Sequence, residues 1–212
     1  MKAHRYPRKD ELIEFARDYA NNLPGWAFYQ DEYVVGASRT AGPLSQNLWL
    51  GGLSSGRYRI LHQVDIPIPH LAAIRAPFPS VGMLSQYPMP PFETVQTSQH
   101  AVRRERVLEA MKRELKPDIL TPLVVDEVAQ ICAPQERTHV ENDILMMAIL
   151  YAWVGERNEA RRRCIRVQSM PIPDVEPDPE RFVALKAFAL ELHRAIESGV
   201  EREFLERLKR PA

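Results

Sequence analysis

The stretch from Ile144 to Val154 reads ILMMAILYAWV, an unbroken run of eleven apolar residues. It is too short to span a bilayer, which needs ~20 residues in a helix. Glu141 and Asp143 precede the run and Gly155 follows it, as is typical of the start and the end of a helix. Because a helix that is apolar on every side must lie inside the protein, the run predicts a helical core in the second half of a soluble, globular chain.

Composition and charge narrow the classes of function. The 212 residues are 45% hydrophobic and 26% charged, and 28 basic residues balance 28 acidic ones. Such values are ordinary for a folded protein with one large or two small domains. A nucleic-acid-binding protein usually has a basic excess, so we expect no nucleic-acid partner, although local basic clusters stay possible.

The first residues and the cysteines indicate a cytoplasmic protein. The chain begins MKAHRYPRKD, without the apolar segment that a secretory signal needs. Its two cysteines, Cys132 and Cys164, each lie in an apolar helical context. We expect both to be buried free thiols, as in a reducing compartment, and we expect no membrane partner.

The spacing of apolar residues predicts the α+β class. The segment from about Lys9 to Leu23 is predicted to be the first helix, because Leu12, Phe15 and Tyr19 recur at helical spacing. After residue 96 the chain is predicted to be mainly helical. Besides the apolar run, helices are expected at Gln99–Lys116, Ile119–Cys132, Glu156–Val167 and Pro179–Ser198, with a short last helix through Phe204 and Leu205.

A small antiparallel β-meander is expected at about residues 26–67, because short connections join its strands. Its last strand, Arg57 to Pro67, alternates between two faces. One face is expected to carry Tyr58, Ile60, His62, Val64 and Ile66, and the other Arg57, Arg59, Gln63 and Asp65. We therefore expect residues 1–95, with the first helix, the sheet and a proline-rich connection, to pack with the helical residues 96–212 as one globular unit.

Two proline-rich segments are candidate partner-binding loops. Pro67–Phe92 is unusually long for a connection without secondary structure, so it is either functional or packed over the domain. Its bulky side chains either cover the sheet or anchor a partner. The acids between Pro173 and Pro179 belong either to a solvated linker or to a surface that attracts a basic partner. The candidate residues are Met83, Tyr87, Met89 and Phe92 as anchors, and Asp174, Glu176 and Asp178 as complementary charge.

One catalytic motif is matched. Residues 52–56, GLSSG, fit the G-x-S-x-G pattern, in which the serine of a hydrolase lies at a sharp turn from a strand to a helix. Here the following segment alternates like a strand, so a hairpin turn explains the glycines and serines. An esterase-like serine hydrolase using Ser54 is the alternative.

A metal site is a second possibility for reactive chemistry. His62 and His70 flank Asp65, but His62 and Asp65 are expected on opposite faces of one strand and cannot share an ion. We therefore interpret His62 as a buried histidine with a hydrogen-bond partner. We expect no catalytic residues, no metal ligands and no cofactor.

The turn around Gly155 resembles the junction of a tetratricopeptide hairpin. Residues 151–160, YAWVGERNEA, place a glycine after the first helix and Ala160 five residues later, where it packs the second helix. No second copy follows at the repeat period of ~34 residues. The resemblance implies a single helical hairpin, which could bind a partner as an adaptor or effector-loading protein.

The first third of the chain resembles bacterial immunity-type proteins, which neutralise interbacterial toxins. The resemblance lies in residues 25–28, GWAF, in residues 44–50, LSQNLWL, and in residues 58–60, YRI. It implies a cytoplasmic protein without catalysis that binds and blocks one cognate toxin domain. We take this protein-binding function as the first hypothesis.

Overall fold

The computed structural model describes residues 6–32, 34–68, 80–81, 94–115, 117–136, 140–172 and 179–207. The described residues form two compact units. The first contains residues 6–40, 45–64 and 94–123, and the second contains residues 41–44, 65–68, 80–81 and 124–207. The long helix after residue 99 therefore belongs with the sheet, whereas the expected division at residue 95 assigned it to the helical part.

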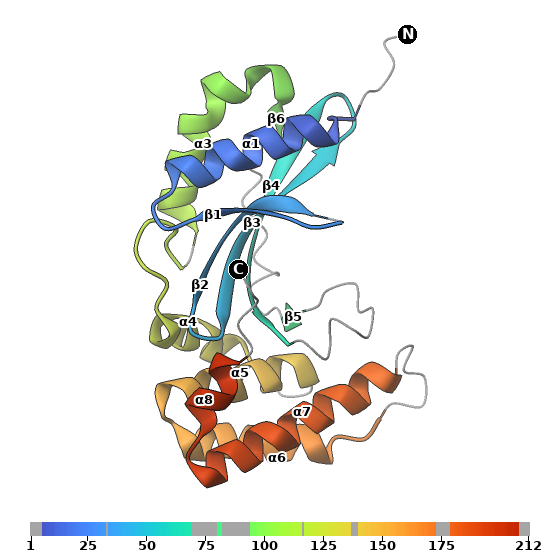
Figure 1. The fold of residues 1–212 in the computed structure, drawn as a ribbon, viewed down its shortest axis with the longest axis vertical. Helices are drawn as coiled ribbons and strands as arrows, with labels where there is room; N and C mark the ends of the chain where they lie inside the picture. The colour runs from blue at the N-terminus through green and yellow to red at the C-terminus, as the bar shows by residue number, and fades with distance from the viewer. Residues whose placement is uncertain are drawn as a thin grey trace. The chain divides into compact units, whose positions relative to one another are not determined.

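The strands form an antiparallel sheet with neighbouring strands joined in chain order, as the meander predicts. The order is β1-β2-β3-β4-β5, and β6 pairs with β4 (Figure 1). The strands are β1 (Ala27–Gln30), β2 (Val35–Ala41), β3 (Leu44–Leu53), β4 (Arg57–Pro67), β5 (Ser80–Val81) and β6 (Val95–Gln96). β1 is an edge strand, and the short strands β5 and β6 were not predicted.

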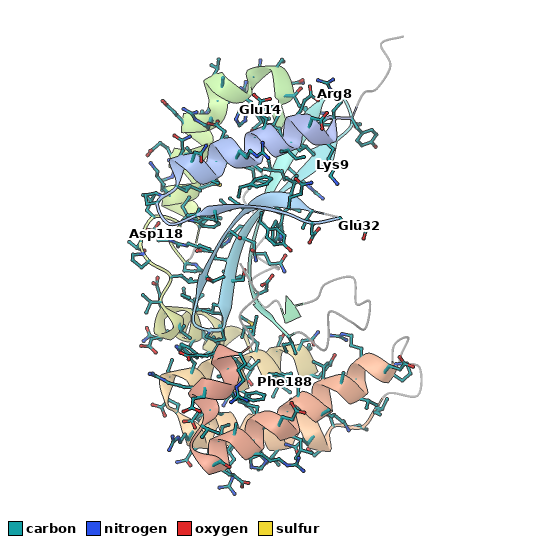
Figure 2. All side chains as sticks on the ribbon, viewed as in Figure 1. Arg8, Lys9, Glu14, Glu32, Asp118 and Phe188 are labelled. Carbon is teal, nitrogen blue, oxygen red and sulfur yellow. The ribbon has the colours of Figure 1, made fainter. Side chains whose placement is uncertain are left out.

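Two helices cover one face of the sheet in the first unit (Figure 1). They are α1 (Lys9–Asn22) and α3 (His100–Glu114), the latter preceded by the 3-10 helix η2 (Thr97–Gln99). Their apolar sides pack with the inward residues of β2, β3 and β4 in one core. The predicted alternation of β4 is confirmed, because Tyr58, Ile60 and Val64 are buried. Lys9 and Glu14 lie on the exposed side of α1, and Arg8, also exposed, directly precedes the helix (Figure 2).

The helix predicted from Ile119 to Cys132 is shorter than expected. The structure has α4 at Val125–Cys132, followed by the 3-10 helix η3 (Ala133–Gln135). In a longer helix the Asp118 carbonyl would need the N–H of residue 122, but Pro122 has none. The Arg39 guanidinium donates to that carbonyl instead. A side chain from β2 thus satisfies the backbone of a segment that proline keeps out of the helix.

The second unit is built around α5 (Glu141–Val154), which contains the apolar run. Residues 144–150 of α5 are fully buried, so the prediction of an interior helix is confirmed. Gly155 ends the helix at φ 90°, a left-handed conformation that favours glycine. None of the described helices combines the length and the apolar character needed to cross a membrane.

Three further helices pack in the second unit: α6 (Arg157–Ser169), α7 (Pro179–Ser198) and α8 (Glu201–Glu206). Ala160 is buried, as the hairpin around Gly155 predicts. Phe188 of α7 contacts Phe204 of α8, with ring centroids 5.5 Å apart (Figure 2). Cys132 and Cys164 are buried free thiols, as expected, and burial raises the pKa of each to about 12.

Candidate functional site

Four side chains from distant parts of the sequence form a hydrogen-bonded chain in the first unit, buried except at its partly exposed end, Asp18. The hydroxyls of Tyr19 and Tyr58 are 3.0 Å apart, and the Tyr58 hydroxyl is 2.7 Å from Nδ1 of His100. Nε2 of His100 is 2.8 Å from a carboxylate oxygen of Asp18. Arg104 donates to the same carboxylate at 2.9 Å. We call Tyr19, Tyr58, His100 and Asp18 the tyrosine–histidine chain.

The tyrosine–histidine chain has the carboxylate–imidazole–hydroxyl order of a nucleophilic triad, but it is closed to substrate. Tyr58 is completely buried, and burial raises its pKa. Burial likewise raises the pKa of Tyr19 to about 12. Burial alone would raise the pKa of Asp18, but hydrogen bonds from His100 and Arg104 outweigh it and lower that pKa. The tyrosine–histidine chain therefore stabilises the packing of α1, β4 and α3.

A second buried polar cluster lies on three neighbouring strands. Arg39 of β2 donates from Nε to Oε1 of Gln46 on β3 at 2.7 Å. The Gln46 amide nitrogen is 2.9 Å from Nε2 of His62 on β4. The Arg39 guanidinium also lies over the Trp26 ring, 5.1 Å from its centroid. This cluster binds the backbone after α3, so it also has a structural role.

His62 is a buried histidine with a hydrogen-bond partner, as predicted. Burial and the neighbouring Arg39 charge lower its pKa to about 4, so the ring is neutral at pH 7. Its Nε2 accepts from the Gln46 amide and is not available to an ion. His70, the other histidine considered for a metal site, lies outside the described residues. Within the described ranges no cluster of three potential metal-ligating side chains occurs.

Ser54 lies in the tight turn between β3 and β4, and it is exposed. The predicted hairpin turn is confirmed, because residues 57–67 form a strand and no helix follows the serine directly. A nucleophile elbow needs a turn from a strand into a helix, whose N-terminus helps to stabilise an oxyanion. The structure gives Ser54 no such setting.

The face of the sheet opposite α1 carries large side chains that are partly exposed. Tyr29 of β1 contacts Trp49 of β3, with ring centroids 5.3 Å apart. Leu61 of β4 points to the same face, since its neighbours in the strand are buried on the other one, and it is 40% exposed. We call Tyr29, Trp49 and Leu61 the apolar row.

Hydrogen bonds and a glycine fix the rings of the apolar row. The Trp49 indole donates to Oε1 of Gln63 at 3.3 Å, and the Tyr29 hydroxyl donates to Asp31 at 3.1 Å. Gly36 lies between the two rings on β2, and a Cβ added there would be 2.8 Å from the Trp49 ring. The same Cβ would lie even closer to the Leu48 carbonyl oxygen, so the bare backbone at this position admits both the neighbouring strand and the indole.

Met83, Tyr87, Met89, Phe92, Asp174, Glu176 and Asp178 all lie outside the described residues. The apolar row was missed, although β3 contained a signal. Its even positions, Gln46, Leu48 and Leu50, point to the core, so strict alternation assigns Trp49 to the other face. A tryptophan on the outer face of a strand is an unusual exposure of a large apolar side chain.

The helical hairpin in the second unit presents a basic surface. Arg161 and Arg162 of α6 have side-chain exposures of 53% and 75%. Arg161 is 3.6 Å from Glu197, and Arg162 is 2.8 Å from Glu159. Ion pairs of this exposed kind stabilise little, so the two arginines are suited to probe the adaptor alternative by mutation.

Comparison of the chain with family models, with curated proteins and with solved structures gives no match.

Proposed function

We propose that the chain is a protein-binding protein that neutralises a cognate bacterial toxin, and that the partner docks on the apolar row. The observation that carries the proposal is Trp49, held by Gln63 and packed over Gly36 on a partly exposed sheet face. Large aromatic side chains on rigid elements are typical anchors of protein interfaces. Their orientation before binding reduces the entropy that association costs.

The two buried polar groupings support a binding role. Both the tyrosine–histidine chain and the cluster of Arg39, Gln46 and His62 connect secondary-structure elements inside the first unit. Their side chains are used for stability, so the binding role is assigned to the apolar row. The toxin as partner rests on the resemblance of the first third of the chain to immunity-type proteins. The residues that carry this resemblance overlap the start of β1 and most of β3, including Trp49.

Co-expression with the toxin domain encoded beside this gene tests the proposal, with bacterial growth and the affinity of the purified pair as readouts. The wild-type chain is expected to restore growth. Trp49→Ala and Leu61→Glu are expected to weaken the complex by about 30-fold or more, which corresponds to ~2 kcal/mol for loss of an interface anchor. Circular dichroism checks that both variants are folded.

Val102→Glu is the matched control, because Val102 is 86% exposed on α3, outside the row. It is expected to bind like the wild type. If the wild-type chain neither binds the toxin domain nor protects the cell, the proposal is wrong. If Arg161→Glu and Arg162→Glu abolish binding while the row variants keep it, the adaptor hypothesis replaces it.

A further inference from the structure

The outer edge of β1 has backbone groups available for pairing. Within the sheet β1 pairs with β2 on one side, and Tyr29 lies opposite Gly36. The turn that joins the two strands closes with the Asp31 N–H donating to the Val34 carbonyl at 3.0 Å. In an antiparallel ladder, hydrogen-bonded pairs alternate with pairs that are not hydrogen-bonded to each other. The turn therefore fixes which residues of β1 direct their backbone N–H and C=O groups to the outer edge of the sheet.

Counting from the Asp31–Val34 pair, Tyr29 is hydrogen-bonded to β2, whereas Phe28 and Gln30 are not. The N–H and C=O groups of Phe28 and Gln30 therefore point to the outer edge. No hydrogen bond to these four groups is found within the part of the chain that the structure describes. The edge thus offers two donors and two acceptors, in the spacing of a strand.

The side chains beside this edge define what an added strand would meet. On one face lies Tyr29, the end of the apolar row that continues to Trp49. On the other face lies Phe28, with the Arg17 guanidinium 4.9 Å from its ring centroid. Arg17 is exposed, and Glu32 is exposed at the tip of the hairpin (Figure 2). Side chains of a strand alternate between faces, so each face selects its own residue type.

We propose that the partner adds an extended segment to β1, as a further strand of the sheet. Its apolar side chains pack against Tyr29 and Trp49, and on the other face an acidic side chain pairs with Arg17. Backbone hydrogen bonds to Phe28 and Gln30 supply affinity, and the two faces supply specificity. The inference rests on the proposed function, because it assigns the form of the segment that reaches the apolar row.

A short synthetic peptide in which valine alternates with glutamate is the probe. Titration into the ¹⁵N-labelled chain is expected to shift the amide signals of Phe28 and Gln30 and the indole signal of Trp49. Of two peptides N-methylated at alternate residues, at the valines or at the glutamates, the one whose methyl groups face β1 is expected to bind at least ~10-fold more weakly than the other, because those methyl groups remove the donors to the sheet edge. If the peptide leaves the β1 amides unchanged, or if N-methylation has no effect, the proposal is wrong.

Gln30→Pro is the discriminating variant. It removes an outward N–H that β2 does not use, and proline is tolerated on edge strands, so the fold is expected to be retained. The variant is expected to lose the peptide and the toxin domain, whereas the control Gln30→Ala keeps both. If Trp49→Ala weakens toxin binding and Gln30→Pro does not, strand addition fails while the proposed function stands. If the chain alone forms a dimer that Gln30→Pro dissociates, a second copy occupies the edge and the assignment to a partner is overturned.

Discussion

Tyr58 connects three elements of the first unit through one hydroxyl group. That hydroxyl lies between Tyr19 and Nδ1 of His100 and is completely buried. Tyr19 is the end member of the tyrosine–histidine chain, and its hydroxyl is hydrogen-bonded to that of Tyr58. Removing the two hydroxyls therefore has different effects. Loss of the Tyr58 hydroxyl leaves the Tyr19 hydroxyl and Nδ1 of His100 without their partner, whereas loss of the Tyr19 hydroxyl removes one hydrogen bond and leaves Tyr58 bonded to His100.

Tyr58→Phe is expected to destabilise the protein by ~2–3 kcal/mol, the usual cost of leaving buried polar groups unpaired, and Tyr19→Phe by ~1 kcal/mol, the usual net value of one hydrogen bond. Urea unfolding at pH 7 measures both free energies of unfolding. The double variant is expected to cost less than the sum of the two, since the two side chains share one hydrogen bond. Equal effects of the single variants would contradict the role of Tyr58 as the middle member.

Two glycines end or connect elements of the second unit, and their surroundings differ. Gly42 lies in the turn between β2 and β3 at φ 54°, and a Cβ added there would be 2.6 Å from the ring of Trp153 on α5. Gly155 has φ 90° at the end of α5, but an added Cβ would meet no atom within 4 Å. Both positions favour glycine by conformation, and Gly42 is in addition restricted by packing.

Gly42→Ala is therefore expected to destabilise more than Gly155→Ala. The left-handed conformation costs ~1–2 kcal/mol in each variant, and the contact with Trp153 adds ~1–3 kcal/mol at Gly42. Thermal unfolding, with tryptophan fluorescence as the signal, compares the two. If both variants lose the same stability, the turn does not pack against the Trp153 ring in solution.

At the scale of the whole molecule, the formal net charge is zero and stability depends on buried titratable groups. His62 is the clearest case, because its pKa falls from 6.5 to about 4 on folding. The unfolded chain therefore binds more protons than the folded one between these values. The contribution of His62 is fully present above pH 6.5 and is lost as the pH falls towards 4.

Lowering the pH from 7 to 5 is expected to cost ~2 kcal/mol of stability through His62, from the difference between its folded and unfolded pKa values. Urea unfolding at both pH values measures the loss. His62→Gln is expected to be less sensitive to pH in this window, whatever its stability at pH 7. Asp18, whose pKa is lowered from 3.8, loses its contribution only at lower pH. An unchanged pH dependence in His62→Gln would contradict the prediction.

The sequence by itself determined the elements whose signals are local. The apolar run gave the buried helix α5, the predicted limits of the helix at Pro179–Ser198 match α7, and the alternation of residues 57–67 gave β4. Gly155 marked the turn of the helical hairpin. These features depend on residues within a few positions of one another, where apolar spacing, proline and glycine act directly on the backbone.

The tertiary structure alone decided which distant residues meet. Asp18, Tyr58 and His100 show no pattern that links them along the sequence, and nothing local indicates that Arg39 donates to the carbonyl that Pro122 leaves without a helical partner. The alternation of β3 placed Trp49 on the outer face, but its contact with Tyr29 depends on the pairing of β1, β2 and β3. Packing brings such residues together across the sheet, and the spacing of residues along the sequence does not predict these contacts.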